Sequence, residues 1–185
     1  MQIKEKLRIF KKNHQNKINQ IIFTKINVKN NTIIDNLINK FLRKKNSFIF
    51  ESVEKRRIRG RYTIIGGDPD KIWEFNNKKI TLIQKESKKI IKKKPYLYLR
   101  KLIENFNFPL PRGLPKLSAL LVGYFSYDVI RYIEKIPNKC KDDLKIPDIR
   151  LLRPKTLIIH DNLLKKVFFI KNCFGDQKIS NYNKY

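Results

Sequence analysis

The sequence predicts an α+β fold in which a mostly antiparallel sheet, of the kind that forms half of a β-sandwich, is flanked by a few helices. Three observations predict this class. Segments rich in β-branched and aromatic residues outnumber segments with helical periodicity. Hairpin signals outnumber crossover connections between strands. The chain has 185 residues, 41% of them hydrophobic, which is enough for one domain with a buried core.

The first part of the chain predicts a helix between two strands. Residues 1–19 are polar and basic, and we expect them to fray or to form a short helix. Residues 20–26 are rich in β-branched and aromatic side chains, which favours a strand. Residues 32–43 repeat apolar side chains at helical spacing, and residues 47–53 form a short apolar run typical of a buried strand.

The middle of the chain predicts two further strand regions. Residues 61–67 favour a strand, and the Asp-Pro pair at residues 68–69 is a turn signal. Residues 71–83 predict a hairpin around the two asparagines at 76–77, since asparagine tolerates positive φ. The lysine-rich residues 88–94 are interpreted as a solvated connector, with a phosphate-binding patch as the alternative.

The last part of the chain predicts a helix and a second hairpin. Residues 95–106 have helical periodicity and begin with a proline, which suits the first turn of a helix. A proline-rich loop then precedes the apolar run 117–127, in which Gly123 allows another backbone to approach closely. Residues 156–170 predict two strands that pair around a turn.

Charge is the anomaly of the composition. Lys and Arg together number 43 and Asp and Glu 16, so the net charge is +27. Such a balance is typical of proteins that bind nucleic acid or another anionic surface. The basic residues are nevertheless spread along the whole chain, and Lys, Asn and Ile are abundant together. These three residues share codons rich in A and T, so a genome bias explains the charge without a ligand.

Several classes of protein are excluded by what the sequence lacks. It has no run of about 18 apolar residues, so we expect no membrane partner. The N-terminal residues have no apolar run, so we expect no secretory signal. Cys140 and Cys173 are far apart, and His14 and His160 lack metal-ligand spacing, which disfavours a disulfide framework or a zinc site. A reducing cytoplasm is the compartment that these features favour.

One cluster of polar side chains is the strongest candidate for a binding site. Glu51 and Ser52 end one predicted strand, and Arg61, Tyr62 and Thr63 begin the next. If the two strands are neighbours, carboxylate, hydroxyl and guanidinium groups gather at one end of the sheet. Such a set can bind both ends of a zwitterion, with the carboxylate facing an ammonium group. A surface cluster of salt bridges is the alternative.

A second constellation, residues 123–128, carries less chemistry. We expect its aromatic side chains in the core and Asp128 as the cap of a short helix over residues 128–135. No base and nucleophile pair lies nearby, and the neighbouring acids at 142–143 are a weak signal for Mg²⁺. We therefore expect neither a catalytic residue nor a metal ligand in this chain.

Five segments, in order along the chain, resemble anthranilate synthase component I. In that family an LLES segment is followed, after a ten-residue spacer, by a residue with a hydroxyl group. Here Ser52 ends a similar segment, and Thr63 follows it at that spacing. The other four segments are residues 59–69, 123–134, 142–148 and 156–161, which are similar in turn to the family's GRYSFIGLDP, GYFGYDxVRYIE, DDLGLPD and DTLVVFD. The resemblance covers residues 20–172, between a basic N-terminal segment (1–19) and a tail (173–185).

This resemblance implies the N-terminal portion of an enzyme that converts chorismate to anthranilate and pyruvate, with ammonia from a glutamine amidotransferase subunit. It also implies part of a feedback site for L-tryptophan, with Ser52 as the first candidate and Glu51 beside it. Arg61, Tyr62 and Thr63 are candidates of second rank. In the family, chorismate and Mg²⁺ bind in a C-terminal chorismate-utilising portion, which nothing after residue 172 resembles.

The expected role is therefore regulatory and structural. We expect no cofactor in this chain, with Mg²⁺ belonging to the complete enzyme. The expected partners are L-tryptophan, the chorismate-utilising portion and the glutamine amidotransferase subunit, with no membrane and no nucleic acid among them.

Three alternatives stay open at this point. The N-terminal portion of aminodeoxychorismate synthase component I shares the resemblance, although the segments 51–66 and 142–148 favour the anthranilate branch. A basic nucleic-acid-binding module would follow from the charge alone, but no nucleic-acid-binding motif accompanies it. A truncated or decayed remnant is the third, because Ser118, Ala119 and Ser126 stand where the family usually has glycines.

Overall fold

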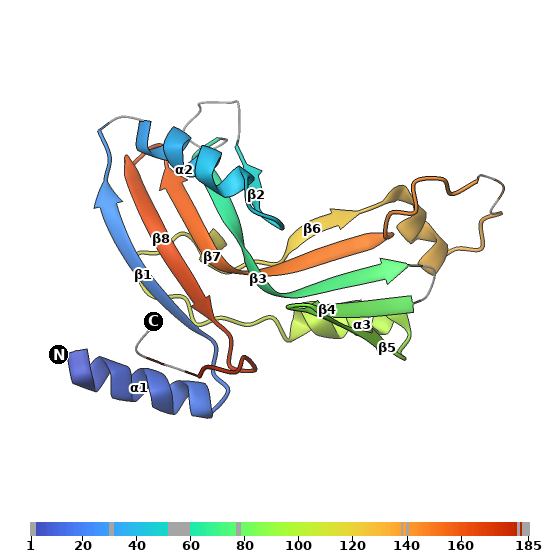
Figure 1. Cartoon of the computed structure of the whole chain (residues 1–185), viewed down its shortest axis with the longest axis horizontal. Coiled ribbons are helices and arrows are strands. Elements are labelled where there is room, and N and C mark those ends of the chain that lie inside the picture. The colour runs from blue at the N-terminus through green and yellow to red at the C-terminus, as the bar shows by residue number, and fades with distance from the viewer. Residues whose placement is uncertain are drawn as a thin grey trace. The chain divides into compact units, whose positions relative to one another are not determined.

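The computed structural model describes residues 3–29, 32–51, 60–76, 79–137, 139, 141–180 and 182 (Figure 1). Its helices are α1 (Ile3–Gln15), α2 (Thr32–Leu42) and α3 (Pro95–Glu104), with the short 3₁₀ helices η1 (Lys116–Ser118) and η2 (Tyr127–Tyr132). Its strands are β1 (Gln20–Asn27), β2 (Phe48–Phe50), β3 (Tyr62–Asn76), β4 (Lys79–Gln84), β5 (Ser87–Ile91), β6 (Val122–Phe125), β7 (Ile149–Asp161) and β8 (Lys166–Cys173). Among the described residues, no helix is long and apolar enough to cross a membrane.

The strands form a sheet in the order β1-β8-β7-β3-β4-β5, with β2 added to β3 and β6 added to β7. The pairs β1–β8, β7–β8, β2–β3, β3–β4, β4–β5 and β6–β7 are antiparallel. The predicted α+β class with a mostly antiparallel sheet is thus confirmed. Short connections suffice for such pairs, which agrees with the two hairpins that the sequence predicts.

The described chain divides into two compact units. The first contains the residues up to 69, residues 108–120 and the residues from 154 on, and the second contains residues 70–107 and 121–153. Two long strands, β3 and β7, have residues in both units.

The first unit has apolar side chains on both faces of its sheet. One cluster lies under α2, where Ile34 packs with Ile65 of β3 and Val167 of β8. The other cluster contains the alternate residues of the same strands, including Ile64 and Leu157. Because successive side chains of a strand point to opposite faces, these two clusters cover the two faces of the sheet.

The second unit is built around aromatic side chains. Trp73 and Phe75 of β3 are buried with Ile149 and Leu151 of β7. The helix α3 packs against this cluster, and the indole Nε1 of Trp73 donates a hydrogen bond of 3.1 Å to the hydroxyl of Tyr98. A buried indole N–H is thereby satisfied, which avoids the cost of an unpaired donor.

Two sequence predictions about the middle of the chain are wrong. The turn predicted at residues 68–69 is absent, because β3 continues from Tyr62 to Asn76. Asp68 instead takes a left-handed conformation with φ of 54° inside the strand region. The lysine-rich segment is not a plain connector, because β5 (Ser87–Ile91) pairs with β4. Lysines are common on edge strands, where their charge discourages pairing with another chain.

Most of the remaining elements agree with the predictions, but the aromatic side chains of residues 123–128 do not lie in the core, because Tyr124, Phe125 and Tyr127 are exposed. The predicted strand over 20–26 and the predicted helix over 32–43 correspond to β1 and α2. Pro95 lies in the first turn of α3, and the two predicted hairpins are β3–β4 and β7–β8. Asp128 is not the cap of η2: Ser126 holds that position, and the carboxylate of Asp128 accepts a 2.7 Å hydrogen bond from Nε of Arg131.

Candidate functional site

The candidate site lies where β2 ends and β3 begins. The two strands pair antiparallel, and Phe50 opposite Ile64 is the last pair. Glu51 follows Phe50 along the chain and Thr63 precedes Ile64, so both residues lie at the same end of the strand pair. The condition set by the sequence, that these strands be neighbours, is therefore met. The side chain of Glu51 is exposed, and Ser52 lies outside the described residues.

Thr63 is the buried hydroxyl of this site. Its side chain is only 3% exposed. The amide nitrogen of Asn162, in the turn after β7, lies 3.4 Å from Oγ1 of Thr63 and 3.5 Å from the carbonyl oxygen of Gly60. Both contacts are at the long end of hydrogen-bond geometry, so Asn162 holds the start of β3 only weakly through its side chain.

Arg61 is bound to a carboxylate of its own protein. Its Nη2 donates to Oδ2 of Asp161 at 2.7 Å, and its Nε lies 3.1 Å from both carboxylate oxygens. The guanidinium carbon also lies 4.9 Å from the centre of the Tyr62 ring. This fork-like pairing fixes the guanidinium by geometry as well as by charge. Arg61 therefore anchors the site, with its Nε and Nη2 donors directed at Asp161.

Asp161 is the buried partner that completes this arrangement. It is 1% exposed, and its Oδ1 also accepts hydrogen bonds from the backbone amides of Leu163 and Leu164. Burial raises the pKa of Asp161, but the hydrogen bond from Arg61, the two amides and the charge of Arg61 together lower it below its ordinary value. The hydrogen bond to Asp161 correspondingly raises the pKa of Arg61.

The sequence prediction did not include Asp161 or Asn162 in the site. The two residues are 100 positions away from the start of β3, and no local pattern links segments so distant. The one available signal was the hairpin turn after Asp161, which places an aspartate at the position where side chains bind turn amides.

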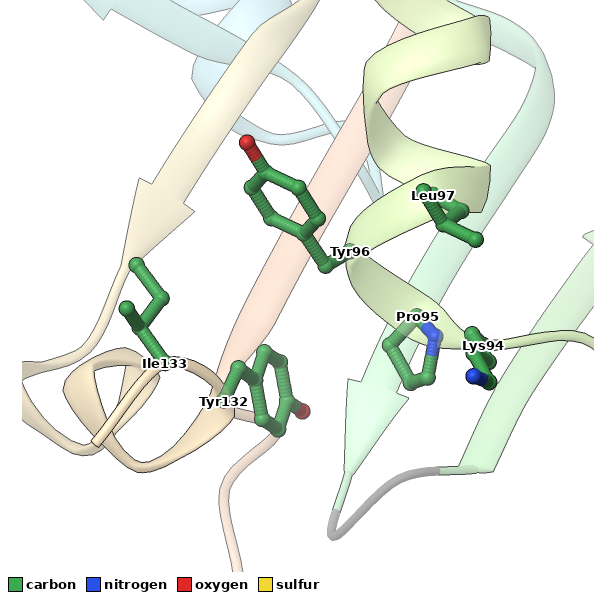
Figure 2. A pocket seen from close by; sticks show the side chains of 6 residues that line it. All are labelled: Lys94, Pro95, Tyr96, Leu97, Tyr132 and Ile133. Carbon is green, nitrogen blue, oxygen red and sulfur yellow. The ribbon is translucent and has the colours of Figure 1, made fainter. Parts of the chain in front are cut away.

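Two hollows lie away from these residues. The larger has a volume of about 550 Å³ in the second unit, and Figure 2 shows side chains from the start of α3 on one side of it and those of Tyr132 and Ile133, at the end of η2, on the other. Its lining is mostly apolar: Lys94, Pro95, Tyr96, Leu97, Tyr132 and Ile133. The smaller, of about 330 Å³, lies in the first unit and is lined by Phe41, Lys44, Lys45, Ser47, Gly67, Asp68 and Thr156. We call the smaller one the lysine pocket.

The resemblance places Mg²⁺ in the complete enzyme, and a metal ion held by this chain would need a set of its side chains as ligands. Within the ranges that the structure describes, no three His, Cys, Asp or Glu side chains gather into a group that could hold a metal ion. Asp142 instead accepts a 2.9 Å hydrogen bond from the backbone amide of Lys145. The described His, Cys, Asp and Glu side chains therefore do not fit a metal centre.

Similar proteins point to one enzyme. No family model matches the chain. Anthranilate synthase component 1 of Cereibacter sphaeroides is 28% identical over 167 residues, which are 88% of this chain and 33% of that protein. The protein of the same name from Saccharomyces cerevisiae is 34% identical over 134 residues, which are 70% of this chain and 24% of that protein. The chain belongs to the family of anthranilate synthase component I.

A solved structure supports the same assignment at the level of the fold. The crystal structure of anthranilate synthase component I from Streptococcus pneumoniae matches with a TM-score of 0.54 and 20% identity, over 77% of this chain and 31% of that one. The chain corresponds to the N-terminal region of anthranilate synthase component I. It spans about a quarter to a third of the length of the curated relatives that it matches.

Proposed function

We propose that this chain is the regulatory and structural N-terminal portion of anthranilate synthase component I and carries part of a feedback site for L-tryptophan. The whole enzyme converts chorismate to anthranilate and pyruvate, with ammonia from a glutamine amidotransferase subunit. The observation that carries the proposal is the antiparallel pairing of β2 with β3, which brings Glu51 to the start of β3. In this proposal the chain itself supplies no catalytic residue.

The chemistry of the site suits the polar end of an amino acid. Among the described residues, no partner of the exposed Glu51 carboxylate is found, so this group is available for an ammonium group. Arg61 is held by Asp161, and its place in the proposal is to fix the backbone and the ring of Tyr62 next to the ligand. In the proposal, the hydroxyl of Ser52 hydrogen-bonds the ammonium or carboxylate of L-tryptophan. The buried Thr63 packs at the same end of β3 and contacts Asn162.

The partner of the regulatory portion is the chorismate-utilising portion of the enzyme. Within residues 125–146 of the second unit, five large apolar side chains among the described residues are more than half exposed, which is unusual for a surface that always faces water. These are Phe125, Tyr127, Ile133, Leu144 and Ile146. In the proposal they pack against the chorismate-utilising portion. L-tryptophan then inhibits by binding one of two conformations of the complete enzyme more tightly than the other.

Calorimetry with L-tryptophan on the full 185-residue chain tests the site. We expect weak binding, since the chorismate-utilising portion completes the site, and a further loss of affinity in Ser52→Ala and Glu51→Gln. Ser87→Ala is the matched control, because Ser87 is an exposed serine of β5 in the second unit whose hydroxyl donates to the carbonyl oxygen of Gln84 in its own turn. Equal affinity of the Ser52→Ala variant and the unmodified chain would show that the site is assigned to the wrong residues.

A further inference from the structure

The lysine pocket lies at the far end of the β2–β3 pair from the proposed tryptophan site. Phe48 pairs with Gly66, so Ser47 and Gly67 of the pocket lie just before and after that pair. Glu51 lies beyond the other end, after the pair formed by Phe50 and Ile64. The two sites therefore share a strand pair and no lining residue.

One carboxylate of the pocket already binds two lysines. Oδ1 of Asp68 lies 3.1 Å from Nζ of Lys155 on β7, and its Oδ2 lies 3.2 Å from Nζ of Lys171 on β8. One negative charge cannot balance two ammonium groups, so a positive charge remains around Asp68. The left-handed backbone of Asp68 presents this side chain at the surface, where it is about half exposed.

Two more lysines line the same pocket. Lys44 and Lys45 are exposed residues that follow α2, and in the part of the chain that the structure describes neither is paired with a carboxylate. Nζ of Lys44 lies over the ring of Phe41, 5.0 Å from its centre, which positions the ammonium group without neutralising it. Counted over the described residues, the pocket and its immediate partners therefore bring together four ammonium groups and one carboxylate.

A hydroxyl group adds a directed donor. Nζ of Lys171 donates a long hydrogen bond of 3.5 Å to Oγ1 of Thr156, which leaves the hydroxyl proton of Thr156 for another acceptor. The hydroxyl of Ser47 donates to the carbonyl oxygen of Lys44 at 2.7 Å and so offers only an acceptor. The donors that the lining residues offer are thus the ammonium groups of Lys44 and Lys45 and the hydroxyl of Thr156.

We propose that the lysine pocket binds a phosphoryl group carried by a small molecule. The excess of ammonium groups calls for a ligand with more than one negative charge, and a phosphoryl group carries about −1.5 to −2 at pH 7 with three acceptor oxygens. A singly charged carboxylate is already present as Asp68 and leaves the excess in place. The volume of about 330 Å³ is at the small end of the range of ligand pockets, which suits a small molecule.

Calorimetry with two probes tests this proposal: inorganic pyrophosphate and ribose 5-phosphate. The salt concentration is about 0.15 M, where the Debye length is about 8 Å and distant lysines contribute little. We expect saturable binding of at least one probe, and the comparison of the two shows whether a free anion or an organic phosphate is preferred. Absence of saturable binding of both probes would overturn the proposal.

Charge-matched variants separate the pocket from the general basicity of the chain. The double variant Lys44→Gln, Lys45→Gln should weaken binding by about tenfold or more, because it removes two charges at the pocket. The control Lys88→Gln, Lys89→Gln removes two exposed charges on β5 and should change the affinity by less than about twofold. An equal loss in the two double variants would mean that the binding is non-specific.

A substitution with the opposite sign gives an independent check. Asp68→Asn frees Lys155 and Lys171 and should tighten binding by about threefold or more. Glu104→Gln removes one exposed carboxylate from α3 and should leave the affinity unchanged. Circular dichroism confirms that each variant is folded. Weaker binding in Asp68→Asn would contradict the proposal, and none of these results depends on the binding of L-tryptophan.

Discussion

Arg61 and Asp161 show how a candidate binding residue acquires a structural role. The guanidinium that the sequence offers for a ligand carboxylate is held by a buried aspartate, with the shortest contact at 2.7 Å. A bidentate pair of this kind defines the position of the backbone on both sides. Among the described site residues, Glu51 is the one whose side chain is exposed.

The Asp161→Asn variant should lose stability in a manner that depends on pH. The folded pKa of Asp161 is lowered from its ordinary value of 3.8, so its contribution is complete above that value and is lost as the pH falls through the folded pKa. The difference in the free energy of unfolding between the unmodified chain and the variant should therefore be largest near pH 7. It should shrink below about pH 4.

Urea unfolding at a series of pH values measures this difference. Glu104→Gln is the control, since Glu104 forms an exposed pair with Arg100 that is worth about 0.5 kcal/mol or less. A difference for Asp161→Asn that stays constant from pH 7 to about pH 3 would exclude the ionised carboxylate as its origin.

Residue-level prediction succeeds where the signal is local. The sequence places Glu51, Arg61, Tyr62 and Thr63 at adjoining strand ends, and the register of β2 and β3 agrees. It does not place Asp161, because the partner comes from a strand 100 residues later. The pairing of Arg61 with Asp161 depends on β3 and β7 being neighbours in the sheet, and no local pattern in a single sequence encodes that order.

At the scale of elements, the close approach of β6 to β7 depends on Gly123. A Cβ atom at this position would lie 1.7 Å from the carbonyl oxygen of Arg150 on β7, which is far inside a van der Waals contact. The sequence predicts that Gly123 allows such an approach, and the structure confirms it. Backbone atoms cannot yield as a flexible side chain does, so the strands must separate if a side chain is added.

Gly123→Ala should therefore destabilise the chain by about 1–3 kcal/mol, the usual cost of forcing an extra carbon into a packed region. Chemical denaturation measures this loss. Gly67→Ala is the matched control, because a Cβ there makes ordinary contacts from 3.5 Å outwards. It should be neutral or stabilise by up to about 1 kcal/mol through the unfolded state. Equal stability of the two variants would show that β6 moves freely against β7.

Element boundaries were predicted least well where a strand contains an irregular residue. The Asp-Pro pair at 68–69 has the composition of a turn, yet β3 continues through it, with Asp68 in a left-handed conformation. Lysines of β7 and β8 bind Asp68 from the neighbouring strands, so tertiary contacts outweigh the local turn preference. The pairing of the lysine-rich β5 with β4 is a similar case, because the partner strand supplies the hydrogen bonds.

At the scale of the whole molecule, two compact units share two strands. Trp73 is the single tryptophan of the chain and belongs to the second unit, whereas Cys173 is completely buried in the first. Burial raises the pKa of the Cys173 thiol to about 12, so the folded first unit should protect it from alkylation. The two residues therefore report on the two units separately.

We expect both units to unfold together in urea, because β3 and β7 have residues in each and cannot unfold in one unit without loss of order in the other. Trp73 fluorescence and alkylation of Cys173, measured in a Cys140→Ser background, should give the same midpoint. Two separate midpoints would show that the units fold independently.

The continuity of β3 also matters while the chain is folding. A slip of β3 by one residue would turn Ile64 and Ile65 to the wrong faces in one unit and Trp73 and Phe75 to the wrong faces in the other. No misregistered intermediate can keep one core intact at the expense of the other. Kinetic traps of this type should therefore be shallow, and the newly made chain can correct its strand pairing before exposed edges aggregate.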